Sequence, residues 1–197
     1  MGFLSSLFSS KPDLNDGIKE LALAIWETVP TLVSTIRNDV YKTNQELTVG
    51  IDPEIHSAFI HFVSRVALHT GGAKFQDAIY ANLRDKIAET YSIAFSKYLR
   101  LSQGRNLSPR ALQREFNDVV REREIEYAKY SGGYGDEDTN KNSLIWAIAT
   151  RIHEISGFRV MDDDAAILGI GNTFVVRLSE LQLDKRLELL ETNFHTK

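Results

Sequence analysis

Apolar residues recur at helical spacing along most of this 197-residue chain, and this periodicity constrains the fold more than any other feature. Between residues 14 and 40, the steps from one apolar residue to the next are three or four residues, which places them on one face of an α-helix. The stripe consists of Leu14, Ile18, Leu21, Ile25, Val29, Leu32, Ile36 and Val40. Its phase continues through Pro30, which removes the hydrogen bond to the carbonyl of Trp26. We therefore predict one long helix kinked near Pro30, or two helices in line.

Turn and capping signals divide the rest of the chain into further helices. Asp52-Pro53 and Ser108-Pro109 are typical of helix starts, and Gly71-Gly72 is typical of a helix end. Gly157 ends a later helix, and the apolar phase changes near Leu183, which indicates a bend. These breaks predict a single all-α domain over residues 12–197, a bundle of six or seven helices.

Residues 165–178 admit two interpretations. Gly169, Gly171 and the pair Val175-Val176 suit a short β-hairpin that turns at Gly171-Asn172. The apolar residues of the same stretch are instead spaced as in a helix, at Ile167, Ile170, Phe174, Leu178 and Leu181. We predict a helix here and keep the hairpin as the alternative.

Composition excludes several classes of function. The chain has 27 acidic and 23 basic residues, a net charge of −4, which argues against nucleic acid as a partner because backbone contacts need a basic excess. Cysteine is absent, so thiolate nucleophiles, disulfides and cysteine-held metals are excluded. No apolar run has the length needed to cross a bilayer, and no secretory signal is present, so we expect a cytoplasmic protein.

The N-terminal residues 1–11 form a short amphipathic segment that Pro12 separates from the helical domain. In a helix its large apolar side chains would share one face, and they are Phe3, Leu4, Leu7 and Phe8. Such a face would either pack on its own domain or act as a foot on a membrane or a partner. We favour a segment that packs on its own domain or frays, as chain termini do, because ten residues with one lysine offer little area and charge for membrane binding.

The histidines are the first candidates for a metal site. His56, His61 and His69 fall on the second helix, but spacings of 5 and 8 residues point their side chains in different directions. The chain also contains no Glu-x-x-His pattern of the kind found in di-iron bundles. We therefore predict no transition-metal site, and no cofactor of any kind.

The polar loop around residue 138 resembles the opening of a calcium loop. Its alternating oxygen ligands are Asp136, Asp138, Asn140 and Asn142. Lys141 stands where such a loop needs glycine, and Ala147 stands where it needs a bidentate glutamate. We predict a solvated loop that caps the following helix rather than a calcium site.

Arginines are frequent in residues 104–126, but five acidic residues balance the five arginines. Many of these opposite charges lie three or four residues apart, as in the pair Arg114 and Asp118. This pattern predicts a solvent-exposed helix face with internal ion pairs, which can also contact a charged partner.

Four aromatic side chains flank the long polar loop of residues 131–143, where a pocket or contact patch could form. They are Tyr127, Tyr130, Tyr134 and Trp146. His153 and Glu154 on the following helix would supply titratable groups to such a pocket. We favour the interpretation that these aromatics seal the end of the bundle.

No convergent acid–base or metal set is visible in this sequence, so we lean against an enzyme. The best interpretation is a non-catalytic protein–protein interaction or adaptor module that associates with a protein partner or with itself. The alternative is a small-molecule-binding helical protein or enzyme with a pocket near Tyr130, Tyr134 and Trp146. A peripheral membrane protein anchored through residues 3–8 is the third and less favoured interpretation.

Overall fold

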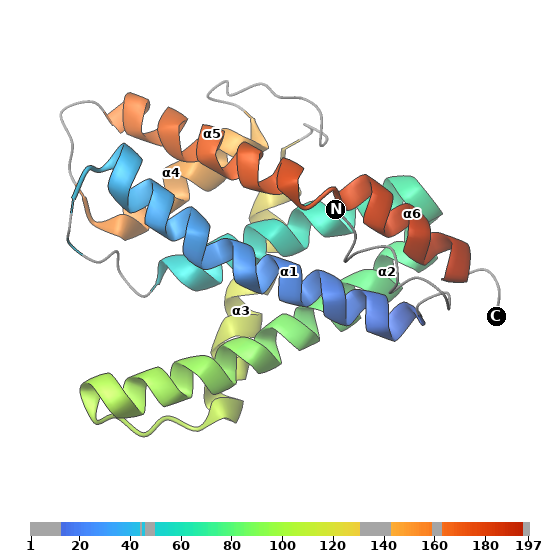
Figure 1. Cartoon of the computed structure of the whole chain (residues 1–197), viewed down its shortest axis with the longest axis horizontal. Coiled ribbons are helices and arrows are strands. Elements are labelled where there is room, and N and C mark those ends of the chain that lie inside the picture. Colours follow the sequence, from blue (N-terminus) through green and yellow to red (C-terminus); the bar gives the residue numbers. More distant parts are fainter. Residues whose placement is uncertain (1–12, 44, 46–49, 131–142, 159–162, 195–197) are drawn as a thin grey trace, which may run out of the picture.

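The structure is a computed structural model and describes residues 13–43, 45, 50–130, 143–158 and 163–194. Within these ranges every regular element is helical, which confirms the all-α prediction (Figure 1). The elements are α1 (Leu14–Thr35), the π-helical turn η1 (Ile36–Val40), α2 (Ile51–Gln103), α3 (Pro109–Tyr127), α4 (Leu144–Ser156), α5 (Asp163–Glu180) and α6 (Leu183–Phe194). None of these helices is both long and apolar enough to cross a lipid bilayer.

Helix α1 buries the apolar stripe that its sequence predicts. It continues through Pro30 as one helix and passes directly into η1. Pro30 itself is exposed, so its ring lies on the side away from the core. Of the two predicted arrangements, one long helix is therefore the observed one, with the π-helical turn added at its end, and the kink near Pro30 stays a prediction.

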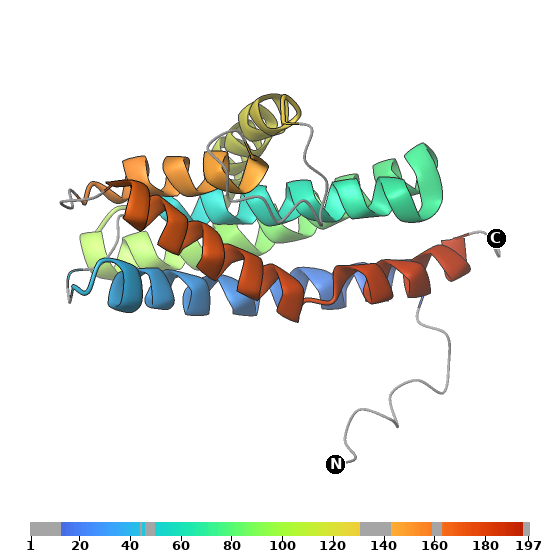
Figure 2. The same ribbon diagram turned by 90° about the horizontal axis from the view of Figure 1, so that it is seen from above.

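Helix α2 consists of two segments that meet at Gly72. This glycine has φ 74° and ψ −175°, a conformation that is essentially restricted to glycine. The chain reverses there, so residues 73–103 run back from the end of residues 51–71 and diverge from them toward the start of α3 (Figures 1 and 2). The predicted break at Gly71-Gly72 is confirmed. The predicted start is two residues late, because α2 begins at Ile51 and Asp52 lies in its first turn.

The first segment of α2 is the central helix of the bundle. Residues on all of its sides are buried between α1, α3, α4, α5 and α6, and they include the polar residues Glu54, His56, Ser57, His61 and Ser64. Phe59 stacks on Phe174 of α5 with ring centroids 4.8 Å apart. The core is therefore built around this segment, and the other helices each contribute one apolar face to it.

Helix α3 begins as its sequence predicts. The Ser108 side chain accepts a hydrogen bond from the Ala111 backbone N–H at 3.3 Å, and Pro109 occupies the first helical position. Helix α3 packs mainly against α2, and the end of α2, the connecting loop and the start of α3 project from the bundle (Figure 1). We call this projection, residues 90–114, the arm.

The alternative of a β-hairpin at residues 165–178 is wrong, because α5 is helical throughout this stretch. Its glycines serve close helix packing instead of a turn. A Cβ atom at Gly171 would lie 3.1 Å from Ile145 of α4, and one at Gly169 would lie 3.2 Å from Val40 of η1. The predicted bend near Leu183 is confirmed, since α6 starts there after a turn at Gln182.

Candidate functional site

The aromatic residues flanking the polar loop separate into two environments. Tyr127 is fully buried, whereas Tyr130 and Trp146 line a hollow of about 400 Å³ between α3 and α4. Glu154 also lines this hollow, but the adjacent His153 does not. Tyr134 lies outside the described residues. The structure therefore brings three of the six predicted site residues together.

A buried carboxylate, Glu54, lies behind this hollow and was not predicted. Its side chain is 2% exposed and accepts a hydrogen bond from the Tyr127 hydroxyl at 2.5 Å. Its second oxygen lies 3.1 Å from Arg123 Nε and 3.8 Å from Arg151 Nε. Burial raises the pKa of Glu54, and the hydrogen bond from Tyr127 and the two arginines oppose that rise. Burial and the neighbouring Glu54 hold the pKa of Tyr127 well above its usual value.

The arginines around the hollow already have carboxylate partners. Arg123 also pairs with Glu126 and, at 3.8 Å, with Glu122, and Arg151 pairs with Glu154 at 3.3 Å, so two arginines face four carboxylates. Among the described residues, Arg123 Nε, Arg151 Nε and the Thr150 hydroxyl have no hydrogen-bond partner. This arrangement suits bound water or a small polar group better than an anion. Glu54 is too enclosed to act on a molecule in the hollow.

His153 connects three segments of the bundle through hydrogen bonds. Its Nδ1 lies 2.9 Å from the Tyr41 hydroxyl, and its Nε2 lies 3.2 Å from Asp163 Oδ1. Tyr41 also contacts the Ser156 hydroxyl at 2.9 Å, and Ser156 donates to the His153 carbonyl at 2.7 Å. This chain of hydrogen bonds joins the end of η1, the end of α4 and the start of α5. Tyr41, His153 and Ser156 are all buried, so these hydrogen bonds lie inside the bundle.

The three histidines of α2 have separate environments. His56 Nδ1 donates to the Asp52 carbonyl at 2.7 Å, whereas His61 Nδ1 lies 3.3 Å from Glu124 Oε1, and His69 is exposed. The described residues contain no group of three or more potential ligands that could hold a metal ion. The calcium-loop residues Asp136, Asp138, Asn140 and Asn142, and the N-terminal foot residues Phe3, Leu4, Leu7 and Phe8, lie outside the described residues.

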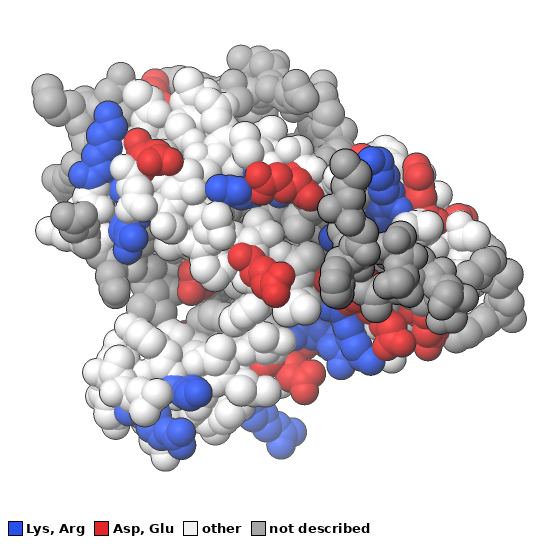
Figure 3. Space-filling model, in the orientation of Figure 1, with Lys and Arg blue, Asp and Glu red and all other residues white. Residues whose placement is uncertain are grey.

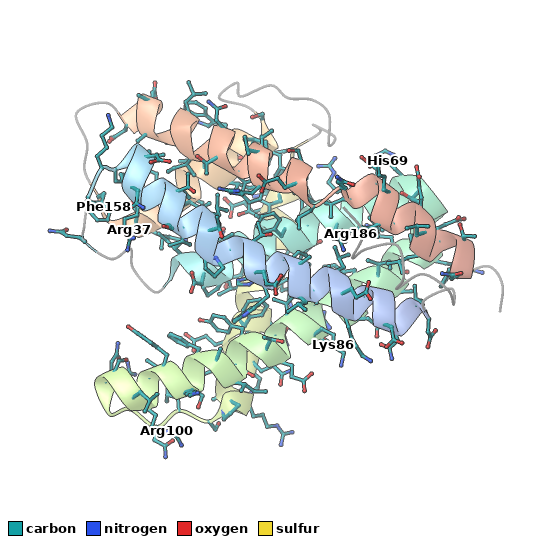
Figure 4. All side chains as sticks on the ribbon, viewed as in Figure 1. Arg37, His69, Lys86, Arg100, Phe158 and Arg186 are labelled. Carbon is teal, nitrogen blue, oxygen red and sulfur yellow. The ribbon has the colours of Figure 1, made fainter. Side chains whose placement is uncertain are left out.

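The arm carries an unbalanced charge that the sequence analysis missed. From Thr90 to Arg114 there is no acidic residue, while five basic residues are present. They are Lys97, Arg100, Arg105, Arg110 and Arg114, and all five are exposed. Figure 3 shows blue side chains on a largely uncharged surface at this projection, and Figure 4 places Arg100 at its far end. None of the five forms an ion pair with any acidic residue that the structure describes.

Large apolar side chains stand exposed among these cations. Leu101 is 72% exposed, Ile93 58% and Tyr98 42%. The positive charge of the arm is hidden when charges are counted over residues 104–126. In that range the acidic residues of the inner part of α3 balance the arginines. A charge count over residues 90–114 would have revealed the positive charge of the arm. The acidic residues that flank this window are Glu89 on one side and Glu115 on the other.

Comparison with family models, curated proteins and solved structures finds no match for this chain. The charged groups of the Glu54 cluster pair with one another, whereas the arm presents cations without ion-pair partners among the described residues, together with apolar side chains, to solvent. The arm is the stronger candidate for a functional site.

Proposed function

We propose that this chain is a non-catalytic docking module that contacts an anionic partner through the arm. The observation that carries this proposal is the segregation of charge. The chain has a net charge of −4 and the arm carries +5, so the remaining residues carry −9. Acidic residues are thus plentiful elsewhere in the chain, yet no acidic residue that the structure describes forms an ion pair with the five cations of the arm.

The arm combines two features that cost free energy in water. Five like charges on one projecting element repel one another, and exposed leucine and isoleucine side chains gain nothing from water. A fold selected for stability alone would intersperse acids among these residues, as it does on the inner part of α3, where Arg121 pairs with Asp118 at 3.6 Å. A partner surface with negative charge would reduce the repulsion between the cations, and contact with it would remove the apolar side chains from water.

A photo-cross-linking experiment tests whether the arm makes the contact. A photoreactive amino acid replaces Leu101 in one protein and Leu189 of α6, which is 58% exposed, in another. Both are expressed in the cells that naturally produce this chain. We expect adducts from position 101 and none from position 189. An adduct at twice the mass of the chain would identify a second copy as the partner.

Two charge variants provide the matched comparison. Lys97→Ala, Arg100→Ala and Arg105→Ala remove three cations from the arm, whereas Lys74→Ala, Lys129→Ala and Lys185→Ala remove three exposed cations elsewhere. The adduct at position 101 should disappear in the first variant and persist in the second. Equal adducts from both positions, or an adduct that survives loss of the arm cations, would refute docking through the arm.

A further inference from the structure

We infer that the anionic surface contacted by the arm is a lipid membrane with acidic headgroups. This inference rests on the proposed function, because it names the partner of the same surface. The first observation is the arrangement of side chains at the end of α2. Ile93, Lys97, Arg100 and Leu101 fall at helical positions that span about 100° of its circumference, so they share one face. All four are exposed.

Two apolar and two cationic side chains lie together on this face, so it can offer an anionic interface both apolar contact and positive charge. Lysine and arginine can lay their methylene groups along the acyl boundary and hold their charged ends at the headgroups. Leu101 and Ile93 supply the apolar contact between them, and Tyr98 adds an aromatic ring with a polar end. Single-stranded nucleic acid would instead favour aromatic platforms for base stacking over exposed aliphatic side chains.

The second observation is where the acidic residues begin. Glu89, the nearest acid on α2, is twelve residues before Leu101, or about 18 Å along the helix axis. The Debye length at physiological ionic strength is about 8 Å, so its repulsion from an anionic surface at the level of Leu101 is largely screened. On α3, Glu115 lies more than one turn inward from Pro109. The arm can therefore meet an acidic membrane tip-first, with Arg100 and Leu101 nearest the surface, Lys97 about one turn behind them, and Ile93 about 12 Å behind Leu101 along the helix axis.

Vesicle binding of the full chain tests this inference. The vesicles are phosphatidylcholine alone, or phosphatidylcholine with about 30 mol % phosphatidylserine, an anionic surface that attracts basic segments. We expect co-sedimentation only with the acidic vesicles, and loss of binding when salt is raised from about 0.1 M to about 1 M. Each arm cation removed should weaken binding about five-fold, so the triple arm variant should bind about 100-fold more weakly. The triple variant of Lys74, Lys129 and Lys185 should bind as the unmodified chain does.

A fluorescence measurement locates the contact. Because the chain has no cysteine, Leu101→Cys and Leu189→Cys each give a single site for an environment-sensitive dye. The dye at position 101 should brighten and shift to the blue with acidic vesicles, while the dye at position 189 should not change. Leu101→Ser should weaken binding about ten-fold, because it removes the most exposed apolar side chain of the arm.

The outcomes separate this inference from the proposed function. Cross-linking of a protein at position 101 without vesicle binding would overturn the membrane inference and leave docking through the arm intact. Tighter binding to a single-stranded oligonucleotide than to acidic vesicles would also overturn it in favour of nucleic acid. Vesicle binding that survives the triple arm variant but is lost on deletion of residues 1–11 would assign the membrane contact to the N-terminal segment instead. Absence of both vesicle binding and cross-linking at position 101 would refute both proposals.

Discussion

Acidification from pH 7 to pH 5 is expected to destabilise this fold through His56. The ring of His56 is almost completely buried, packs 5.2 Å from the ring of Trp26, and is 6.1 Å from that of Phe116. Its Nδ1 donates to the Asp52 carbonyl, so Nε2 is the unprotonated nitrogen, and Nε2 has no partner among the described residues. Burial lowers the pKa of His56 from 6.5 to about 4.

The sign and the size of the effect follow from this shift. Between pH 6.5 and pH 4 the unfolded chain binds a proton at His56 that the folded chain excludes. Stability contributed by neutral His56 is therefore present above the unfolded pKa and is lost as the pH falls toward the folded one. One pKa unit corresponds to about 1.4 kcal/mol, so about 2 kcal/mol should be lost between pH 7 and pH 5. Burial raises the pKa of Asp52, so protonation of this carboxyl stabilises the fold as the pH falls, which opposes the effect of His56.

Urea denaturation at pH 7 and pH 5 measures this loss. His56→Phe keeps an aromatic ring against Trp26 and removes the titrating group. The free energy of unfolding of this variant should therefore fall by about 2 kcal/mol less than that of the unmodified chain between pH 7 and pH 5. Asp52 remains in both proteins, so its contribution largely cancels in the comparison. His69→Gln, at an exposed position, is the control and should follow the unmodified chain. Equal losses for the unmodified chain and His56→Phe would refute the argument.

Two further predictions concern buried polar contacts and backbone conformation. Tyr127→Phe removes the donor to Glu54 Oε1 and leaves a buried carboxylate oxygen without it, so urea denaturation should show a loss of about 1–3 kcal/mol; an unchanged free energy of unfolding would contradict the buried hydrogen bond. Gly72→Ala places a side chain at φ 74° and ψ −175° and should destabilise by about 1–3 kcal/mol or more. Gly104→Ala, at φ 64° and ψ 11°, should cost less, because the left-handed helical region is open to other residues at about 1–2 kcal/mol; the reverse order in thermal denaturation would contradict this reading of Gly72.

The helices were predictable because burial on one face leaves a local periodic signal. The stripe of α1, the break at Gly72 and the start of α3 at Ser108 are all encoded within a few neighbouring residues. The choice of helix over β-hairpin for residues 165–178 also followed from spacing. The spacing could not explain why glycines occur in this helix. They are needed because Ile145 packs closely against Gly171 and Val40 packs closely against Gly169.

The site residues were harder to predict because their partners are distant in the sequence. Glu54 meets Tyr127 across 73 positions, and nothing in its neighbouring residues sets it apart from the other polar residues of the same helix, such as Asp52 and His56. Trp146 and Glu154 line the same hollow, whereas nothing in the spacing indicated that the His153 side chain would contact Tyr41 instead. The arm was missed because its charge is continuous only across the loop that joins two helices.

The separation of +5 on the arm from −9 elsewhere also gives the molecule an electric dipole moment along a defined direction. In the field of any negatively charged surface, a torque will rotate the freely diffusing molecule until the arm leads. Collisions would then be oriented before contact, which raises the rate of productive encounter more than the lifetime of the bound state. Salt shortens the reach of this field, so the association rate should fall with ionic strength more steeply than the dissociation rate rises.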